Sequence, residues 1–147
     1  MKGEPVKYVY NTNLKWVGEK KGKLSAEGKP DILTACPPEF QGHPNIWSPE
    51  DLYIASVEVC TMTTFLYLAK KFNLEIKSYQ SKAKGIAQLV DKYFQFSSIK
   101  IDLKIGVCDK KEKDKINKIL EKIPKICLVS NSIKSKVIMK ADIFVEK

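Results

Sequence analysis

The pattern of hydrophobic and polar positions changes several times along the chain, and its first part predicts short strands followed by a loop. Up to about Ala35, apolar runs alternate with glycine-containing turns, in "VKYVYNTNLKWV", "GEKKG", "KLSAEG" and "KPDILTA". This pattern predicts a small antiparallel meander. The next segment, "CPPEFQGHPNIW", contains three prolines and a glycine, which predicts a loop.

The most apolar segment, "SPEDLYIASVEVCTMTTFLYLAKKF" at residues 48–72, predicts a long helix. Ser48 offers a hydroxyl cap, Pro49 suits the first helical position, and two acidic residues follow, where they complement the positive end of the helix dipole. Further along, the apolar residues leave no broad polar face. A helix that is apolar all round must be surrounded by protein, and the rest of one chain offers little cover. We therefore predict a homodimer in which two such helices pack inside sheets from both subunits.

The second half of the chain alternates between strand and helix patterns. Residues 76–90 alternate loosely and "SSIKIDLKIGV" alternates almost strictly, so we expect a hairpin that turns near "DKYFQF". In "DKKEKDKINKILEKIP" the apolar residues recur at helical spacing and Pro124 is expected to end the helix. The tail, "SKVIMKADIFVEK", predicts a last strand. The order βββ-α-ββ-α-β predicts an α+β fold, with antiparallel sheets around a long buried helix.

The length and the N-terminal sequence bound the organisation of the chain. With 147 residues, it is expected to form a single domain, residues 1–147. The N-terminal "MKGEPVKYVYN" has charges and a proline where a signal peptide needs an apolar run, so we expect a cytoplasmic protein. The apolar window from Leu52 to Ala69 is nearly long enough for a bilayer, but it contains Glu58 and several hydroxyl side chains. We expect no membrane span.

The charge of the chain comes from one residue type. The formal net charge is +9, and all 26 basic residues are lysines. Proteins that bind nucleic acids use arginine for bidentate contacts and gather basic residues on one element, whereas these lysines are spread over turns and helix faces. The composition therefore favours a solvated, lysine-rich surface and argues against a nucleic-acid-binding protein.

The four cysteines, Cys36, Cys60, Cys108 and Cys127, form no CxxC pair and no Cys/His ligand pattern, and His43 is the only histidine. This argues against a metal site. In a reducing compartment these cysteines are either small core residues or reactive thiols. A single cysteine in an apolar helix, such as Cys60, is more often a core residue.

Cys127 adds weight to the reactive alternative. It follows the expected helix end and precedes "LVSNSIK", which places it near the start of a new short helix, where the dipole favours a thiolate. Two such thiols could form a pair of nucleophile and resolving cysteine. Glu50 precedes Cys60 by ten residues, or about 15 Å along a straight helix. Any contact between them must therefore cross a subunit interface or involve a loop; otherwise Glu50 is an ordinary first-turn acid.

Three motifs occur together in this chain. They are a Phe-x-Gly loop at Phe40 and Gly42, a Ser-Pro-Glu helix start with a cysteine ten residues after the glutamate, and a second cysteine followed by x-Val-Ser before the last strand. Together with the order of elements, they resemble the OsmC/Ohr family, named after osmotically inducible protein C and organic hydroperoxide resistance protein. The resemblance extends from about Trp16 to the C-terminus.

This resemblance implies an intertwined homodimer and a cofactor-free thiol peroxidase for organic hydroperoxides. It implies that Cys60 is the peroxidatic cysteine, Cys127 the resolving cysteine and Glu50 the active-site glutamate. Cys36 and Cys108 match neither motif. An external dithiol or lipoyl-type reductant would regenerate the thiols, and no metal is expected.

The chain departs from the family in the positively charged residue that stabilises the thiolate. The family steadies the thiolate with an arginine, and this chain has none. In one branch the arginine lies in the turn where this chain has "GEKKGK", so Lys20 or Lys21 is a candidate replacement, although each is also an ordinary solvated turn residue. In the other branch the corresponding residue is Glu39, which has the opposite charge. His43, on the same loop, is a further candidate.

Apolar side chains near the thiol would set the preference for substrate. We expect Phe40, Trp47, Phe65 and Leu66 to form an apolar wall that favours fatty or aromatic hydroperoxides over hydrogen peroxide. The alternative is a protein that has kept the fold and the thiols but lost efficient peroxidase chemistry, and binds small apolar or thiol-reactive molecules.

Overall fold

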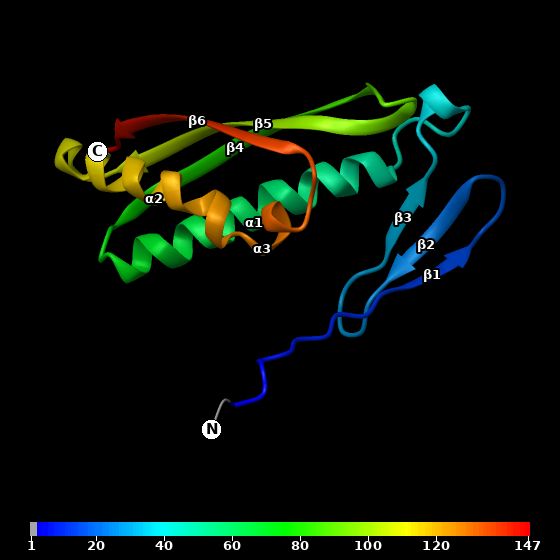
Figure 1. Cartoon of the computed structure of the whole chain (residues 1–147), viewed down its shortest axis with the longest axis horizontal. Helices are drawn as coiled ribbons and strands as arrows, with labels where there is room; N and C mark the ends of the chain where they lie inside the picture. Colours follow the sequence, from blue (N-terminus) through cyan, green and yellow to red (C-terminus); the bar gives the residue numbers. More distant parts are fainter. Residues whose placement is uncertain (1–2) are drawn as a thin grey trace. The chain divides into compact units, whose positions relative to one another are not determined.

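The computed structural model describes residues 3–147 and divides the chain into two compact units, one up to Leu52 and the other Tyr53–Lys147. Each unit contains a three-stranded sheet (Figure 1). Three strands come first, then a long helix, a hairpin, further helices and a last strand. The predicted α+β class and the predicted order of elements are confirmed.

The sheet of the N-terminal unit is fully antiparallel, with the order β1-β2-β3. Its elements are β1 (Asn13–Trp16), β2 (Lys21–Ser25), β3 (Ile32–Ala35) and the short 3-10 helix η1 (Pro38–Phe40). The predicted meander is therefore present. Its first strand is shorter than the alternating pattern suggested, because residues 3–12 pair with no other strand.

The long helix α1 (Pro49–Lys71) begins where the sequence predicted. The Ser48 hydroxyl accepts a hydrogen bond from the Asp51 amide at 3.1 Å, and the Asp51 carboxylate accepts one from the Ser48 amide at 2.9 Å. These reciprocal bonds satisfy backbone groups that the first turn leaves unpaired. After the helix, Asn73 has a positive φ of 54° and the Leu74 amide bonds the Ala69 carbonyl, which ends the helix in the manner of a left-handed cap.

The C-terminal unit contains β4 (Ile76–Val90), β5 (Tyr93–Val107) and β6 (Lys136–Val145) in the order β4-β5-β6. Asp91 and Lys92, both with positive φ, close the β4–β5 hairpin. We expected antiparallel sheets throughout, but β6 pairs with β5 in the parallel sense. The helices between the two strands form a crossover that carries the chain back before it re-enters the sheet, and such a crossover produces a parallel pair.

The core of this unit lies between one face of the sheet and its helices. The alternating residues of β5 are at most 1% exposed, as predicted for Ile99, Ile101, Leu103, Ile105 and Val107. The helices α1 and α2 (Lys113–Ile126) lie on the same side of the sheet (Figure 1). The apolar stripe of α2 is buried there, and its lysines face outward.

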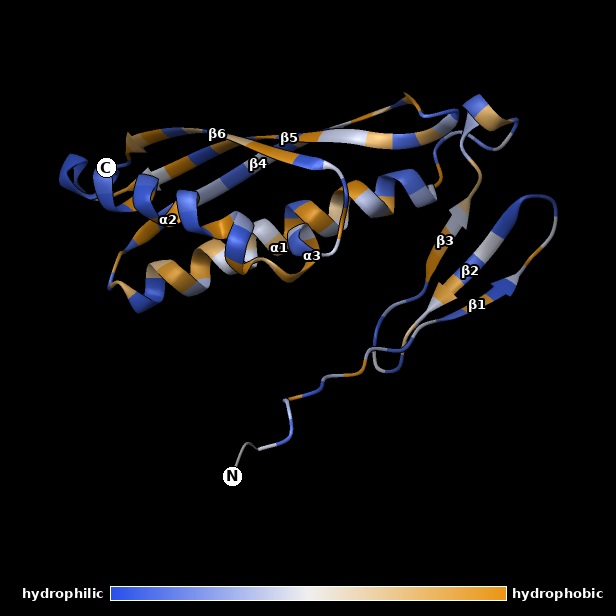
Figure 2. Ribbon diagram, in the orientation of Figure 1, coloured by the Kyte–Doolittle hydropathy of each residue, from blue (hydrophilic) through white to orange (hydrophobic). Residues whose placement is uncertain are grey.

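Only one side of α1 is buried within the single chain. Val57, Thr61 and Phe65 are fully buried, whereas Val59 and Tyr67 are 54% and 63% exposed. Figure 2 shows apolar residues on turn after turn of this helix. By length and composition α1 could also cross a membrane, a test that core helices of soluble proteins pass as well. In this chain the Ser81 hydroxyl of β4 donates a hydrogen bond to the Glu58 carboxylate of α1 at 2.5 Å, a polar contact between helix and sheet.

The prediction that Pro124 ends the second helix was wrong. The 3-10 helix η2 (Lys110–Glu112) leads into α2, which continues to Ile126, and the short helix α3 (Leu128–Asn131) follows. Proline removes one donor, but the Cys127 amide still bonds the Ile123 carbonyl at 2.8 Å. The helix therefore continues for two residues beyond the proline, and the chain leaves it at Cys127, whose backbone is extended.

Candidate active site: a pair of thiols on α1 and α3

The structure brings two of the predicted site residues together in the C-terminal unit. The sulfur atoms of Cys60 and Cys127 lie 2.7 Å apart, close enough for one thiol to donate a hydrogen bond to the other. Cys60 lies in the middle of α1 and is partly exposed, whereas Cys127 is fully buried. Both remain free thiols. The prediction that Cys127 precedes a short helix is confirmed.

The junction between α2 and α3 fixes the position of Cys127. Its extended backbone ends one helix and begins the next. Its carbonyl accepts hydrogen bonds at 3.0 Å from both the backbone and the side-chain amide of Asn131. The amide of Asn131 also bonds the Lys125 carbonyl. These hydrogen bonds fix the turn that carries Cys127, and the Cys127 sulfur lies next to Cys60 of α1.

The two thiols differ in acidity. Burial raises the pKa of Cys60, and the hydrogen bond and charge of Cys127 add to the rise, against lowering contributions from the Val129 backbone and the Thr64 hydroxyl. Burial opposes ionisation at Cys127 too, but the interactions of its sulfur with Cys60, with Ser130 and with the backbone of α3 outweigh burial and lower the pKa of Cys127. Cys127 is thus the more acidic thiol of the pair within this chain.

The geometry suits disulfide chemistry. A disulfide bond is about 2.05 Å long, so the sulfurs need only a small approach to bond. Cys60 is the partly exposed member, whereas Cys127 is fully buried. The pair can therefore act as an accessible nucleophile with a buried resolving thiol.

Sequence reasoning missed two residues that affect the pKa values of the thiols. Thr64 lies four residues after Cys60, one helical turn away, so helical spacing could have identified it. Ser130 belongs to the Val-Ser motif, to which the sequence assigned no role, and it contributes to the lowered pKa of Cys127. Neither residue is charged, so the acidity of the pair is set by hydrogen bonds and burial.

The predicted cation candidates lie in the N-terminal unit, each with a partner. Lys21 forms an ion pair with Glu19 at 2.6 Å, and His43 lies 3.6 Å from the same carboxylate. The hydrogen bond and charge of Lys21, with the charge of His43, lower the pKa of Glu19. Lys20 donates to the Phe40 carbonyl at 3.0 Å. Their role beside a thiolate stays a prediction.

The predicted substrate residues differ in environment. Phe65 is fully buried and packs against Tyr79, with ring centroids 5.6 Å apart, so its ring belongs to the core of the C-terminal unit. Leu66, Phe40 and Trp47 are 40%, 51% and 54% exposed. One carboxylate oxygen of Glu50 is buried without a hydrogen-bond partner among the described residues. The apolar wall expected of Phe40, Trp47, Phe65 and Leu66 stays a prediction.

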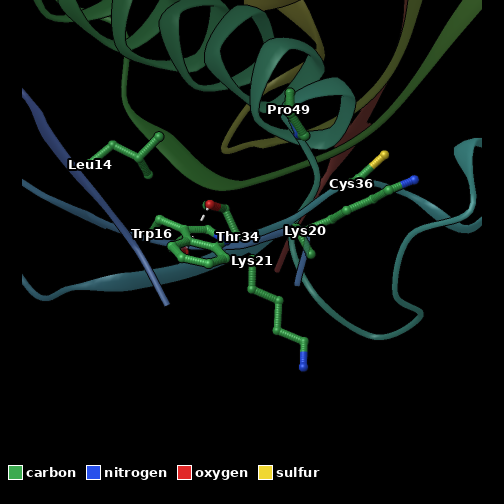
Figure 3. Close-up of a pocket in the computed structure, with 9 residues that line it drawn as sticks. Leu14, Trp16, Lys20, Lys21, Thr34, Cys36 and Pro49 are labelled. Atoms are coloured by element: carbon green, nitrogen blue, oxygen red, sulfur yellow. Dashed lines mark hydrogen bonds between the residues drawn. The ribbon is translucent and has the colours of Figure 1, made fainter. Parts of the chain in front are cut away.

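A pocket of about 420 Å³ opens in the N-terminal unit beside β2 and β3. Trp16, Lys20, Lys21 and Cys36 are among the residues that line it (Figure 3). Within residues 3–147, no three His, Cys, Asp or Glu side chains gather as a metal ion would require.

Comparison with known proteins places this chain in a family. The sequence model of the OsmC-like proteins matches residues 42–142, more than half of the chain. The chain belongs to the OsmC-like family. The match spans the boundary between the two units and includes both Cys60 and Cys127. No curated protein matches the sequence.

Solved structures share the OsmC-like fold at low sequence identity. An OsmC-like protein of unknown function from Vibrio cholerae aligns with a TM-score of 0.85 at 16% identity, over 92% of this chain and 100% of that chain. An organic hydroperoxide resistance protein from Elizabethkingia anophelis aligns with a TM-score of 0.70 at 18% identity, over 96% and 100%. The organic hydroperoxide resistance protein OsmC from Legionella pneumophila aligns with a TM-score of 0.67 at 19% identity, over 93% and 98%.

Proposed function

We propose that this OsmC-like protein is a thiol peroxidase that reduces organic hydroperoxides. The observation that carries the proposal is the pair of sulfurs 2.7 Å apart, one reachable and one buried. Membership of the OsmC-like family supports it, as do structural neighbours that are named organic hydroperoxide resistance proteins.

The reaction proceeds in two steps on the two sulfurs. The Cys60 thiolate attacks the terminal oxygen of the hydroperoxide, the O–O bond breaks, and the alkoxide leaves and takes up a proton as the alcohol. Cys60 is then a sulfenic acid. The Cys127 thiolate attacks this sulfur and displaces hydroxide, which leaves as water, and a disulfide forms. An external dithiol or lipoyl-type reductant restores both thiols by disulfide exchange.

The acidities of the two thiols suit the second step better than the first. The lowered pKa of Cys127 supplies the thiolate that resolves the sulfenic acid. The raised pKa of Cys60 means that the first step needs a positive charge that the C-terminal unit alone does not place on that sulfur. We take Lys20, Lys21 and His43 as the candidate sources of this charge, Glu50 as the active-site glutamate and a homodimer as the active form.

Intact mass after one equivalent of cumene hydroperoxide tests the proposal. Wild-type protein should lose two hydrogens, and Cys127→Ser should gain one oxygen, because its sulfenic acid has no resolving partner. Cys60→Ser should stay unoxidised at Cys127. Cys36→Ser is the matched control and should behave as wild type. Oxidation of Cys127 that persists in Cys60→Ser would refute the assignment of roles.

The lack of arginine and the raised pKa of Cys60 favour one alternative, a protein that has lost efficient turnover and binds small apolar or thiol-reactive molecules. Steady-state reduction of cumene hydroperoxide with excess dithiol separates the two. Turnover supports the peroxidase. Stoichiometric binding without turnover or disulfide formation supports the alternative.

A further inference from the structure

We propose that the outer face of the β4-β5-β6 sheet, the face turned away from α1, binds the surface of an anionic lipid bilayer. Neither the family motifs nor the proposed peroxidase reaction gives this face a role. Three observations support the inference: the lysines gathered on the face, two lysines directly opposite each other, and the residue types that accompany them.

The strand register defines the outer face. The buried residues of β5 pack against the helices on one side of the sheet (Figure 1), and successive residues of a strand point to opposite faces. Residues 98, 100, 102, 104 and 106 of β5 therefore point outward, and each has a partner on β4 and on β6. Among these fifteen outward positions, six are lysines: Lys82, Lys84, Lys100, Lys104, Lys136 and Lys140.

Positive charge is concentrated on this face. Lysine occupies six of its fifteen positions, against 26 of the 147 residues of the chain, and Asp102 and Asp142 are the only acidic residues among the fifteen. Six positive and two negative charges give the face a formal net charge of +4. All six lysines are exposed, and none of them forms an ion pair within residues 3–147. Their charges are therefore available to an anionic partner.

Lys84 and Lys100 lie directly opposite each other on the outer face. They are register partners on β4 and β5, and the residue beside Lys100 on β6 is the uncharged Ile138. Like charges directly opposite on neighbouring strands destabilise a sheet. An anion bound between the two ammonium groups would remove this repulsion, so the pair indicates an anionic partner.

The extent of the face favours a charged surface over a small anion. Neighbouring strands lie about 4.8 Å apart, and outward residues along one strand are about 7 Å apart, so the lysines extend about 10 Å across the strands and about 20 Å along them. A single small anion reaches only one or two of these charges. The separate headgroups of an anionic bilayer can reach all of them at once.

The accompanying residues favour lipid over nucleic acid. Proteins that bind single-stranded nucleic acids stack the bases on aromatic rings, and the five outward positions of β5 carry none. The chain also lacks arginine, which contacts phosphate groups in bidentate fashion. On β6, Ile138 lies between two of the lysines and is 38% exposed, and Phe144 further along is 40% exposed. Apolar side chains beside basic ones are typical of surfaces that bind at the headgroup region of a membrane.

Co-sedimentation with lipid vesicles tests the inference. The wild-type chain, without hydroperoxide, is mixed with vesicles of phosphatidylcholine alone or with about one third of the anionic phosphatidylglycerol. We expect binding to the anionic vesicles and little binding to the neutral ones. The binding should weaken when the salt concentration rises from about 0.1 M to 1 M, because salt screens exposed charges. No binding to the anionic vesicles, or equal binding to both kinds, would overturn the proposal.

The double variant Lys84→Gln, Lys100→Gln locates the binding surface. Each lysine close to an anionic bilayer contributes about fivefold to the affinity, so the double variant should bind about 25-fold more weakly. The matched control is Lys115→Gln, Lys118→Gln, which removes the same charge from exposed positions of α2, on the other side of the sheet. We expect the control to change the affinity less than about threefold, since exposed charges act over about one Debye length. Equal losses in the two variants would show that net charge, not this face, drives binding.

A parallel titration with a DNA duplex at the same salt concentration separates lipid from nucleic acid. Binding of the duplex without binding of the vesicles would assign the face to nucleic acid and contradict the inference. Circular dichroism checks that every variant is folded. Because no hydroperoxide is present, and Cys60→Ser should bind the vesicles as wild type does, the result is independent of the peroxidase proposal.

Discussion

Tyr79 is a buried polar residue whose hydroxyl has no hydrogen-bond partner among the described residues. Its ring packs on Phe65, and burial together with the charge of Glu58 raises the pKa of Tyr79 to about 12. In the unfolded chain a tyrosine ionises at about 10. The unfolded state therefore loses its proton first, and the stability that this residue contributes is fully present below pH 10 and is lost as pH rises towards 12.

We predict that Tyr79→Phe keeps the free energy of unfolding near neutral pH within about 1 kcal/mol of wild type, because the hydroxyl lacks a partner to lose. Between pH 10 and 12 the variant should lose less stability than wild type. Urea unfolding across this range measures both effects. The control is Tyr93→Phe, whose side chain is 77% exposed and which should follow wild type.

Two neighbouring threonines offer a test of how Cys60 is tuned. The Thr64 hydroxyl contributes a lowering of the pKa of Cys60, whereas the Thr63 hydroxyl donates a hydrogen bond to the Cys60 carbonyl at 3.2 Å. We predict that Thr64→Val raises the pKa of Cys60 and slows its alkylation by iodoacetamide about two- to fivefold near pH 8, since only the thiolate reacts. Thr63→Val should leave the rate unchanged. Equal effects of the two substitutions would argue against a role of the Thr64 hydroxyl in the acidity of Cys60.

At the scale of elements, α1 crosses β4 closely at Gly85. A Cβ atom there would lie 2.6 Å from the Ile54 Cδ1 atom and 2.8 Å from the Phe96 ring. We predict that Gly85→Ala lowers the free energy of unfolding by about 1–3 kcal/mol, through overpacking. Ile54→Val removes the Cδ1 atom, so the double variant should regain part of this loss. Chemical denaturation of the four chains measures the coupling, and additive effects would contradict the contact.

The elements that the sequence predicted well are those set by local interactions. Ser48 and Asp51 cap α1 within one turn, and the alternation of β5 follows from burial of a single face. The parallel pairing of β6 depends on the crossover of α2 and α3, which no local pattern specifies. The extension of α2 past Pro124 depends on the hydrogen bond from the Cys127 amide to the Ile123 carbonyl. The donor of this bond lies beyond the proline.

The same distinction holds for the candidate site. The motifs identified Cys60 and Cys127 individually, but their contact joins elements 67 residues apart and required the fold. The short helix after Cys127 was predictable, whereas the acidity of the two thiols depends on burial and on Thr64 and Ser130. Lys20 was singled out as a cation, but the hydrogen bond from its ammonium to the Phe40 carbonyl, 20 residues away, required the fold.

At the scale of the whole molecule, α1 leaves a stripe of exposed residues that the single chain does not cover. Val59, Thr63, Leu66 and Tyr67 recur at helical spacing, and the three apolar ones are 40–63% exposed. Further exposed apolar residues follow at the tip of the β4–β5 hairpin, where Tyr93 is 77% exposed. Monomeric proteins rarely leave large contiguous apolar surfaces in water, so this stripe favours association.

We predict that the stripe on α1 is covered by a second copy of the chain. Sedimentation at low micromolar concentration should give twice the chain mass of 16.7 kDa. Val59→Lys should shift the protein towards the monomer, because a buried, unpaired ammonium is costly in an apolar interface. Lys104→Glu, an exposed change on β5, is the control and should leave the mass unchanged. A wild-type monomer at this concentration would reject the dimer, and a Val59→Lys dimer would place its interface elsewhere.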